Sequence, residues 1–120
     1  MIFVNFTPMD FSNAKPAQES TPDDLVDIDY YSAKKAAMIL RSVNNKIRQA
    51  VIKAIAENKR LTVTQLYVKL RLEQSVASQH LAILRRSAIV SAERDGKNIY
   101  YSINKGRIAE INLFVKDLVH

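Results

Sequence analysis

All three prolines of this 120-residue chain lie in its first 22 residues, and glycine occurs only at positions 96 and 106. Because proline breaks helix interiors and glycine weakens them, the long proline-free remainder favours a body made mainly of α-helices. Ser, Asn, Asp and Gln surround the prolines, a composition typical of irregular structure. The sequence therefore predicts an irregular N-terminal arm over residues 1–30, whose mobility is left open, and a folded body over residues 31–120.

The overall composition restricts the class of protein. The length suits one domain, and 48% hydrophobic residues favour a folded chain over a disordered one. The absence of cysteine excludes disulfides, thiolate metal sites and redox switching. No apolar run approaches the ~20 residues that span a bilayer, so we expect no membrane partner. The opening MIFVNFTPMDF lacks the basic start and the cleavage site of a signal peptide, and we expect a cytoplasmic protein.

Charge is unevenly distributed along the chain. Residues 1–30 hold one basic side chain against six acidic ones, and residues 31–120 hold 17 basic against six acidic, which gives −5 and +11. A basic body favours a polyanionic partner, although a well-solvated lysine surface would have the same totals. One hypothesis is that the acidic arm lies against the basic surface and competes with the polyanion. A solvated tail, or a strut over other helices, is the alternative.

Five helices are predicted from the spacing of apolar residues and from capping signals. Ser32 is a candidate N-cap for the first helix, and Thr62 with Gln65 forms a T-x-x-Q capping box for the third. A tight turn is predicted at Arg71-Leu72. The inward stripe of the fourth helix is Ala77, Leu81, Leu84 and Ala88. The predicted ranges are 32–43, 45–57, a third helix from residue 62 to the turn, 74–87 and 104–119.

A change of hydrophobic period follows the fourth helix. In VSAERDGKNIYYSI, the residues Ile99, Tyr101 and Ile103 alternate with polar or half-polar neighbours. The Asp95-Gly96 pair lies between two such runs, which is a strong hairpin signal because glycine accepts positive φ. We expect Tyr101 to pack inside the hairpin and Tyr100 to lie on its surface or contact a nucleic-acid backbone.

Two helices joined by a tight turn and followed by a hairpin make a winged helix-turn-helix, which suits duplex DNA. The second of these helices fits the major groove, where Ser and Gln can hydrogen-bond base edges. Its outward face carries small, polar and basic residues, and the hairpin tip adds basic side chains for the phosphate backbone or the minor groove. The outward residues of the helix are Ser75, Ser78, Gln79, Ala82, Arg85 and Arg86.

The stretch from Leu61 to Ile103 resembles the winged helix of the ArsR/SmtB family of bacterial transcriptional repressors. The resemblance rests on S-x-H-L at residues 78–81, L-x-x-[small]-[small]-[aliphatic]-V at 84–90, R-D-G-[basic] at 94–97 and the tyrosine pair at 100–101. With the flanking helices it covers residues 35–118. The family often has glycine in the turn, where this chain has Arg71, and often has Ala-Gly after the recognition helix, where this chain has Ser87-Ala88.

This resemblance implies a homodimer that represses transcription from an operator with inverted-repeat symmetry, and in many members a ligand releases the DNA. The inducer of this chain, if one exists, is not indicated. Arg85 and Arg86 are included in the predicted DNA contacts because of their place at the end of the helix. The positions that match the family's major-groove contacts are Gln74, Ser75, Ser78 and Gln79, and those that match its wing are Arg94 and Lys97.

The last helix has apolar residues on more than one side, which favours burial against a second subunit. Leu113, Phe114 and Val119 widen its apolar surface. Deeper packing into its own domain is the alternative. The predicted dimer interface consists of Leu40 from the first helix and Ile108, Ile111, Val115 and Leu118 from the last.

No cofactor and no enzyme activity are expected. The chain has no glycine-rich phosphate loop, no H-E-x-x-H and no nucleophile elbow. Asp117 and His120 are weak metal candidates: a dimer would bring their number to the four ligands that a tight divalent site needs, but a terminal histidine is often frayed. His80 is expected to support the recognition helix structurally, with a phosphate contact left open. The alternatives to DNA binding are a protein-docking winged helix, for which the outer face of the fourth helix should be apolar, and RNA binding, which requires exposed aromatic rings.

Overall fold

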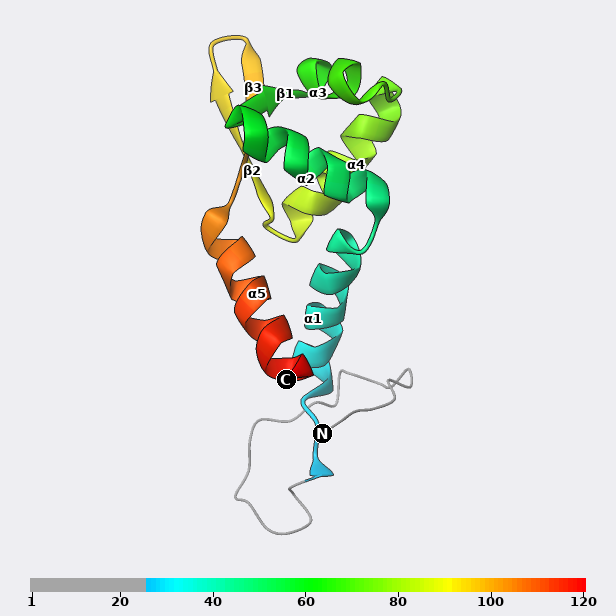
Figure 1. Ribbon diagram of the computed structural model, residues 1–120, viewed down its shortest axis with the longest axis vertical. Coiled ribbons are helices and arrows are strands. Elements are labelled where there is room, and N and C mark those ends of the chain that lie inside the picture. The colour runs from blue at the N-terminus through cyan, green and yellow to red at the C-terminus, as the bar shows by residue number, and fades with distance from the viewer. Residues whose placement is uncertain (1–25) are drawn as a thin grey trace. The chain divides into compact units, whose positions relative to one another are not determined.

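The computed structural model describes residues 26–120, so most of the predicted arm, residues 1–25, lies outside the described part. The chain divides into two compact units, one that ends at Met38 and one that runs from Ile39 to His120. Figure 1 shows the elements in chain order. They are α1 (Tyr30–Val43), α2 (Lys46–Asn58), β1 (Arg60–Thr62), α3 (Val63–Leu70), α4 (Gln74–Arg86), β2 (Val90–Asp95), β3 (Asn98–Ile103) and α5 (Lys105–Val119).

Helix α1 begins two residues before the predicted start, because Asp29 and not Ser32 provides the cap. The backbone N–H of Ser32 donates to Oδ1 of Asp29 at 3.0 Å. Hydrogen bonds from Ser32 lower the pKa of Asp29 below its ordinary value of 3.8. The prediction of a serine cap was therefore wrong. The carboxylate of Asp29, three residues upstream, accepts a hydrogen bond from a backbone N–H of the first turn, as an N-cap residue does.

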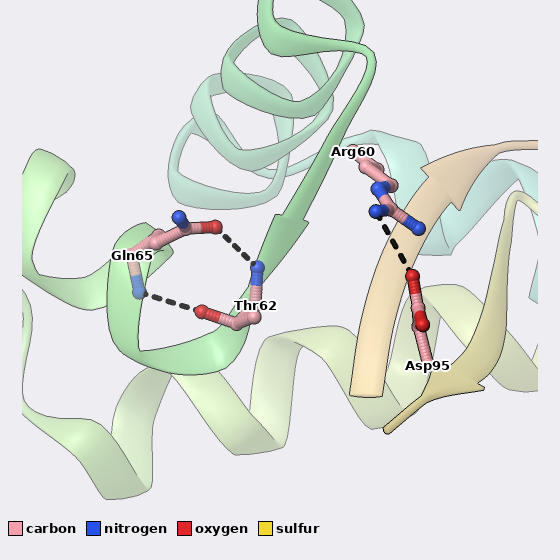
Figure 2. Close-up of polar contacts among 4 residues, drawn as sticks. All are labelled: Arg60, Thr62, Gln65 and Asp95. Atoms are coloured by element: carbon pink, nitrogen blue, oxygen red, sulfur yellow. Dashed lines mark hydrogen bonds and ion pairs between the residues drawn. The ribbon is translucent and has the colours of Figure 1, made fainter. Parts of the chain in front are cut away.

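Capping side chains also fix the starts of α2, α3 and α5. Asn45 accepts from the backbone N–H of Arg48 and begins α2. The predicted capping box is confirmed: Oγ1 of Thr62 accepts from the Gln65 N–H at 3.1 Å, and the Gln65 side chain accepts from the Thr62 N–H at 2.9 Å (Figure 2). At the end of α3, Arg71 adopts the left-handed conformation, with φ 57°. The turn is therefore tight, as predicted, although its residue is not glycine.

The hairpin after α4 is confirmed, and it belongs to a larger sheet than the sequence indicated. Strand β1, which was not predicted, pairs antiparallel with β3, and the sheet order is β1-β3-β2. Asp95 pairs with Asn98 across β2 and β3, so the two turn residues are Gly96 and Lys97 rather than Asp95 and Gly96. Gly96 has φ +67°, which a side chain would disfavour.

The buried core lies between α2, α3, α4 and the sheet. The inward stripe of α4 is confirmed for Ala77, Leu81 and Leu84, which are buried. Ala88 was wrongly included, because α4 ends at Arg86 and Ala88 turns the chain with φ 61°. The buried hydrophobic residues are Val51, Ala54, Ile55, Leu61, Leu66, Ala77, Leu81, Leu84, Ile89 and Val90.

The wing extends beyond this core, as Figure 1 shows for the β2–β3 hairpin. Tyr101 and Ile103 pack against the core from β3, as their alternation predicted. Ile99, which follows the same alternation, is 43% exposed because it lies near the tip. The alternating pattern therefore predicts which side chains are buried only in the part of the sheet that packs against the core.

Candidate nucleic-acid interface

The outer face of α4 is exposed and free of large hydrophobic side chains. All six predicted contact residues on this helix are exposed. Within residues 26–120, the exposed large hydrophobic residues lie on other elements, for example Ile47 on α2 and Val68 on α3. A surface of small hydroxyl, amide and guanidinium groups can approach base edges and phosphates closely. The six residues are Gln74, Ser75, Ser78, Gln79, Arg85 and Arg86.

A hollow of about 500 Å³ lies beside this face. Ser78, Ala82, Arg85 and Arg86 form its α4 wall, since their spacing places them on one side of the helix. Val63, at the start of α3, Tyr101 of β3 and Leu81 of α4 also line it. The two arginines therefore border a concave space between the helix and the wing, which suits a negatively charged backbone. Sequence reasoning missed Val63 and Tyr101 as lining residues, because they are distant from α4 in the sequence and come close to it only when the chain folds.

The wing tip carries both basic residues predicted from the sequence, and both are exposed. Arg94 donates to the carbonyl oxygen of Gly96 at 3.4 Å, which holds its guanidinium beside the turn. Lys97 occupies the second turn position, next to Gly96. The structure therefore places Arg94 and Lys97 together at one end of the hairpin, separate from the residues of α4.

Arg60 lies beside the wing and was not among the residues predicted from the sequence. Its guanidinium lies 3.8 Å from the centroid of the Tyr100 ring and 3.2 Å from Oδ2 of Asp95 (Figure 2 shows the ion pair). It therefore connects β1 to both strands of the hairpin. Tyr100 is half-buried beneath a cation rather than free for base stacking. The only signal that could have revealed Arg60 was the short β1 strand, which lacks a hydrophobic pattern of its own.

His80, on α4, faces α2 rather than the hollow. Its Nδ1 lies 3.3 Å from Nη1 of Arg48. Burial, and then the positive charge of Arg48, lower the pKa of His80 below its ordinary value of 6.5. The neutral ring is thus favoured. The predicted hydrogen-bonded structural role of His80 is consistent with this contact.

The predicted dimer residues have two kinds of environment. Ile108 and Ile111 of α5 are half-buried and pack against the core of their own domain. Leu40 and Val115 are also half-buried. The large exposed apolar side chains of α5 lie in its second half, at Leu113, Phe114, Leu118 and Val119.

The weak metal candidates come from the same helix. Asp117 lies in its last turn and His120 is its C-cap residue. No group of three or more His, Cys, Asp or Glu side chains within residues 26–120 has the arrangement of a metal site. Likewise, none of the helices in this described range has the length and apolar character needed to cross a membrane.

Comparison with known proteins identifies the family. Residues 45–92, which contain α2, α3 and α4, match the family described as "Bacterial regulatory protein, arsR family". The transcriptional repressor PagR of Bacillus anthracis is 34% identical over 84 residues, which cover 70% of this chain and 84% of PagR. This chain belongs to the ArsR family. As an ArsR-family protein it is a DNA-binding transcriptional regulator with a winged helix-turn-helix, and it is not an enzyme.

Other relatives support the same assignment. The transcriptional activator HlyU of Vibrio cholerae is 30% identical over 93 residues, which cover 78% of this ArsR-family chain and 84% of HlyU. The solved structure of NolR from Sinorhizobium fredii superimposes with a TM-score of 0.62 at 28% identity, covering 85% of this chain and 96% of NolR. The structure of PagR superimposes with a TM-score of 0.58, covering 71% and 98%. The relatives include a repressor and an activator by name, so membership of the family does not fix the direction of regulation.

Proposed function

We propose that this protein is a homodimeric, sequence-specific transcriptional repressor that inserts α4 into the major groove of double-stranded DNA. In this proposal Gln74, Ser75, Ser78 and Gln79 contact base edges near the start of the helix. Arg85 and Arg86 contact phosphates near its end. The wing, through Arg94 and Lys97, follows the backbone or enters the adjacent minor groove.

The observation that carries the proposal is the character of the outer face of α4. A helix that docks a protein partner exposes large aliphatic or aromatic anchors. Here the large exposed hydrophobic side chains of residues 26–120 lie elsewhere, and α4 exposes hydroxyls, amides and guanidinium groups. The hollow between Arg85, Arg86 and the wing adds a concave, positively charged border. RNA binding is disfavoured, because the Tyr100 ring is covered by Arg60.

The proposed dimer uses α5, whose second half exposes apolar side chains that a single chain leaves in solvent. Leu113, Phe114 and Leu118 are between 43% and 64% exposed. A second copy of the chain would bury them and would present two α4 helices, as an inverted-repeat operator requires. Since Ile108 and Ile111 pack against their own core, we assign the centre of the interface to the second half of α5.

A fluorescence-anisotropy titration tests the proposal. The probes are the duplex upstream of the protein's own gene and a scrambled duplex of the same composition, each at two salt concentrations. We expect tighter binding to the native duplex with two chains per site, and a salt-dependent affinity for both duplexes. Absence of binding to both at low salt would contradict DNA binding by this surface. A reporter assay with the gene deleted distinguishes repression from activation, and we expect increased transcription.

A further inference from the structure

Arg48, in the first turn of α2, contacts two backbone carbonyl oxygens of α1 and the His80 side chain of α4. Its Nε donates to the carbonyl oxygen of Ser42 at 2.5 Å, and its Nη2 donates to the carbonyl oxygen of Arg41 at 3.2 Å. Its Nη1 lies 3.3 Å from Nδ1 of His80. The carbonyls belong to the last turn of α1, where the helix leaves acceptors unsatisfied and favours a positive charge.

The direction of the contact with His80 follows from the chemistry of the two groups. A guanidinium is always protonated and only donates. Nδ1 of His80 must therefore accept, so the ring is neutral and carries its proton on Nε2. The lowered pKa of His80 agrees with this state. Arg48 of α2 is the charged group that contributes to that shift, and the end of α1 offers it backbone carbonyls.

This contact matters for α4 because the helix has few other polar attachments. Glu73 stands at its N-cap without a side-chain cap hydrogen bond. Within residues 26–120, the contact between Arg48 and His80 is the one side-chain hydrogen bond that joins α4 to another element. Apolar packing of Ala77, Leu81 and Leu84 is non-directional, whereas a hydrogen bond specifies the rotation of the helix about its axis.

We infer that Arg48 is a positioning residue for DNA recognition, which fixes the orientation of α4 by hydrogen-bonding neutral His80 while it is anchored on the end of α1. His80 directly follows Gln79 in the sequence, so any rotation of the helix that breaks the contact also displaces the proposed base-reading side chains. The inference rests on the proposed function, because it assumes that α4 contacts DNA. It assigns Arg48 no contact with DNA itself.

The test compares Arg48→Gln with Lys53→Gln, which removes the same charge from an exposed position of the same helix. The first readout needs no DNA. Amide hydrogen exchange over residues 74–86 should become about tenfold faster in Arg48→Gln, because the lost hydrogen bond involves a charged donor. Exchange over these residues in Lys53→Gln should match that of the wild type.

The second readout is the pKa of His80, followed by NMR, with His80→Asn used to assign the signal. In wild type this pKa should lie below 6.5, with Nδ1 unprotonated in the neutral ring. In Arg48→Gln it should rise toward 6.5, because the neighbouring charge is gone, and in Lys53→Gln it should not change. If Arg48 only stabilised the end of α1 and did not contact His80, the pKa of His80 in Arg48→Gln would equal that of the wild type.

The third readout is DNA affinity, measured on the native and scrambled duplexes. Arg48→Gln should bind the native duplex about tenfold more weakly than Lys53→Gln does, a difference of ~1.4 kcal/mol. His80→Asn places an amide oxygen close to the position of Nδ1 and should retain affinity at pH 7.5. It should also lose less affinity than wild type when the pH falls below 6.5, since it cannot take up a proton.

The outcomes separate this inference from the proposed function. Unchanged exchange in α4 together with an unchanged His80 pKa in Arg48→Gln would overturn the positioning role, whatever the DNA result. Faster exchange combined with the same DNA affinity as Lys53→Gln would overturn its importance for recognition. Failure of the wild type to discriminate between the duplexes would instead contradict the proposed function, while the first two readouts still decide whether Arg48 holds α4.

Discussion

The guanidinium of Arg60 lies 3.8 Å from the centroid of the Tyr100 ring, with Asp95 at 3.2 Å from the same group. Arg60 and Asp95 are 47% and 61% exposed, so their ion pair contributes at most about 1 kcal/mol. An exposed cation–π contact adds about 0.5–1 kcal/mol. The combined effect on global stability is small. Its consequence is local, because these contacts attach the wing to β1.

Substitution Arg60→Gln should therefore change the wing more than the domain. We expect a loss of at most about 2 kcal/mol in the free energy of unfolding, and faster amide exchange at residues 94–99. Hydrogen exchange followed by mass spectrometry measures the wing directly. Asp95→Asn removes the ion pair but leaves the arginine on the ring, so its effect should be smaller. Unchanged exchange in the wing of Arg60→Gln would show that the contacts do not hold it.

Ala88 lies in the left-handed region with φ 61°, where the family often has glycine. This conformation costs an L-residue roughly 1–2 kcal/mol, and glycine avoids that cost but loses about 0.5–1 kcal/mol of chain entropy. We therefore expect Ala88→Gly to raise the free energy of unfolding by about 0.5–1 kcal/mol, measured by urea denaturation. Ala56→Gly, at an exposed helical position, should lower it by about 1 kcal/mol. Equal losses in both variants would refute strain at residue 88.

The lowered pKa of His80 predicts a pH dependence of stability with a definite sign. Because the folded protein binds this proton less tightly than the unfolded chain, the contribution of His80 is complete above pH 6.5 and is lost as the pH falls through the lowered folded pKa. Wild type should lose more stability than His80→Asn between pH 7.5 and pH 5. Urea denaturation at several pH values measures this difference. Parallel pH profiles for the two proteins would rule out the linkage to His80.

The apolar second half of α5 predicts the effect of a charge within the proposed dimer interface. Leu118→Glu should convert the dimer into a monomer, because the carboxylate would be buried without a partner. Asn112→Glu makes the same charge change at another exposed position of α5 and should leave the dimer intact. Light scattering after size-exclusion chromatography gives the mass. A dimer that persists in Leu118→Glu would place the interface elsewhere.

The sequence predicted the five helices and the hairpin because their signals are local. Thr62 and Gln65 are three residues apart, and the inward residues Ala77, Leu81 and Leu84 repeat with the helical period. Arg71 and Ala88 occupy the two positions where the family often has glycine, and both have positive φ. The cap of α1 was missed because Asp29 and Ser32 both suit an N-cap, and local sequence does not choose between them.

The remaining features depend on contacts between distant residues. Arg48 meets His80 across 32 residues, and Arg60 meets Asp95 across 35. Neither pair has a periodic pattern, so no window of sequence reveals it. Strand β1 has three residues and gains its structure by pairing with β3. The outward residues of α4 could be selected in advance because helical geometry alone determines which side chains share a face.

The central claim is that α4 reads bases while the wing contacts the backbone, and a comparison of two variants tests it most directly. The measurement is the affinity of Gln79→Ala and Lys97→Ala for the native and the scrambled duplex over a range of salt concentrations. Gln79→Ala should lose about 1–3 kcal/mol of discrimination between the duplexes, and Lys97→Ala should weaken binding to both and flatten the salt dependence. Equal losses on both duplexes for Gln79→Ala would contradict base reading by α4.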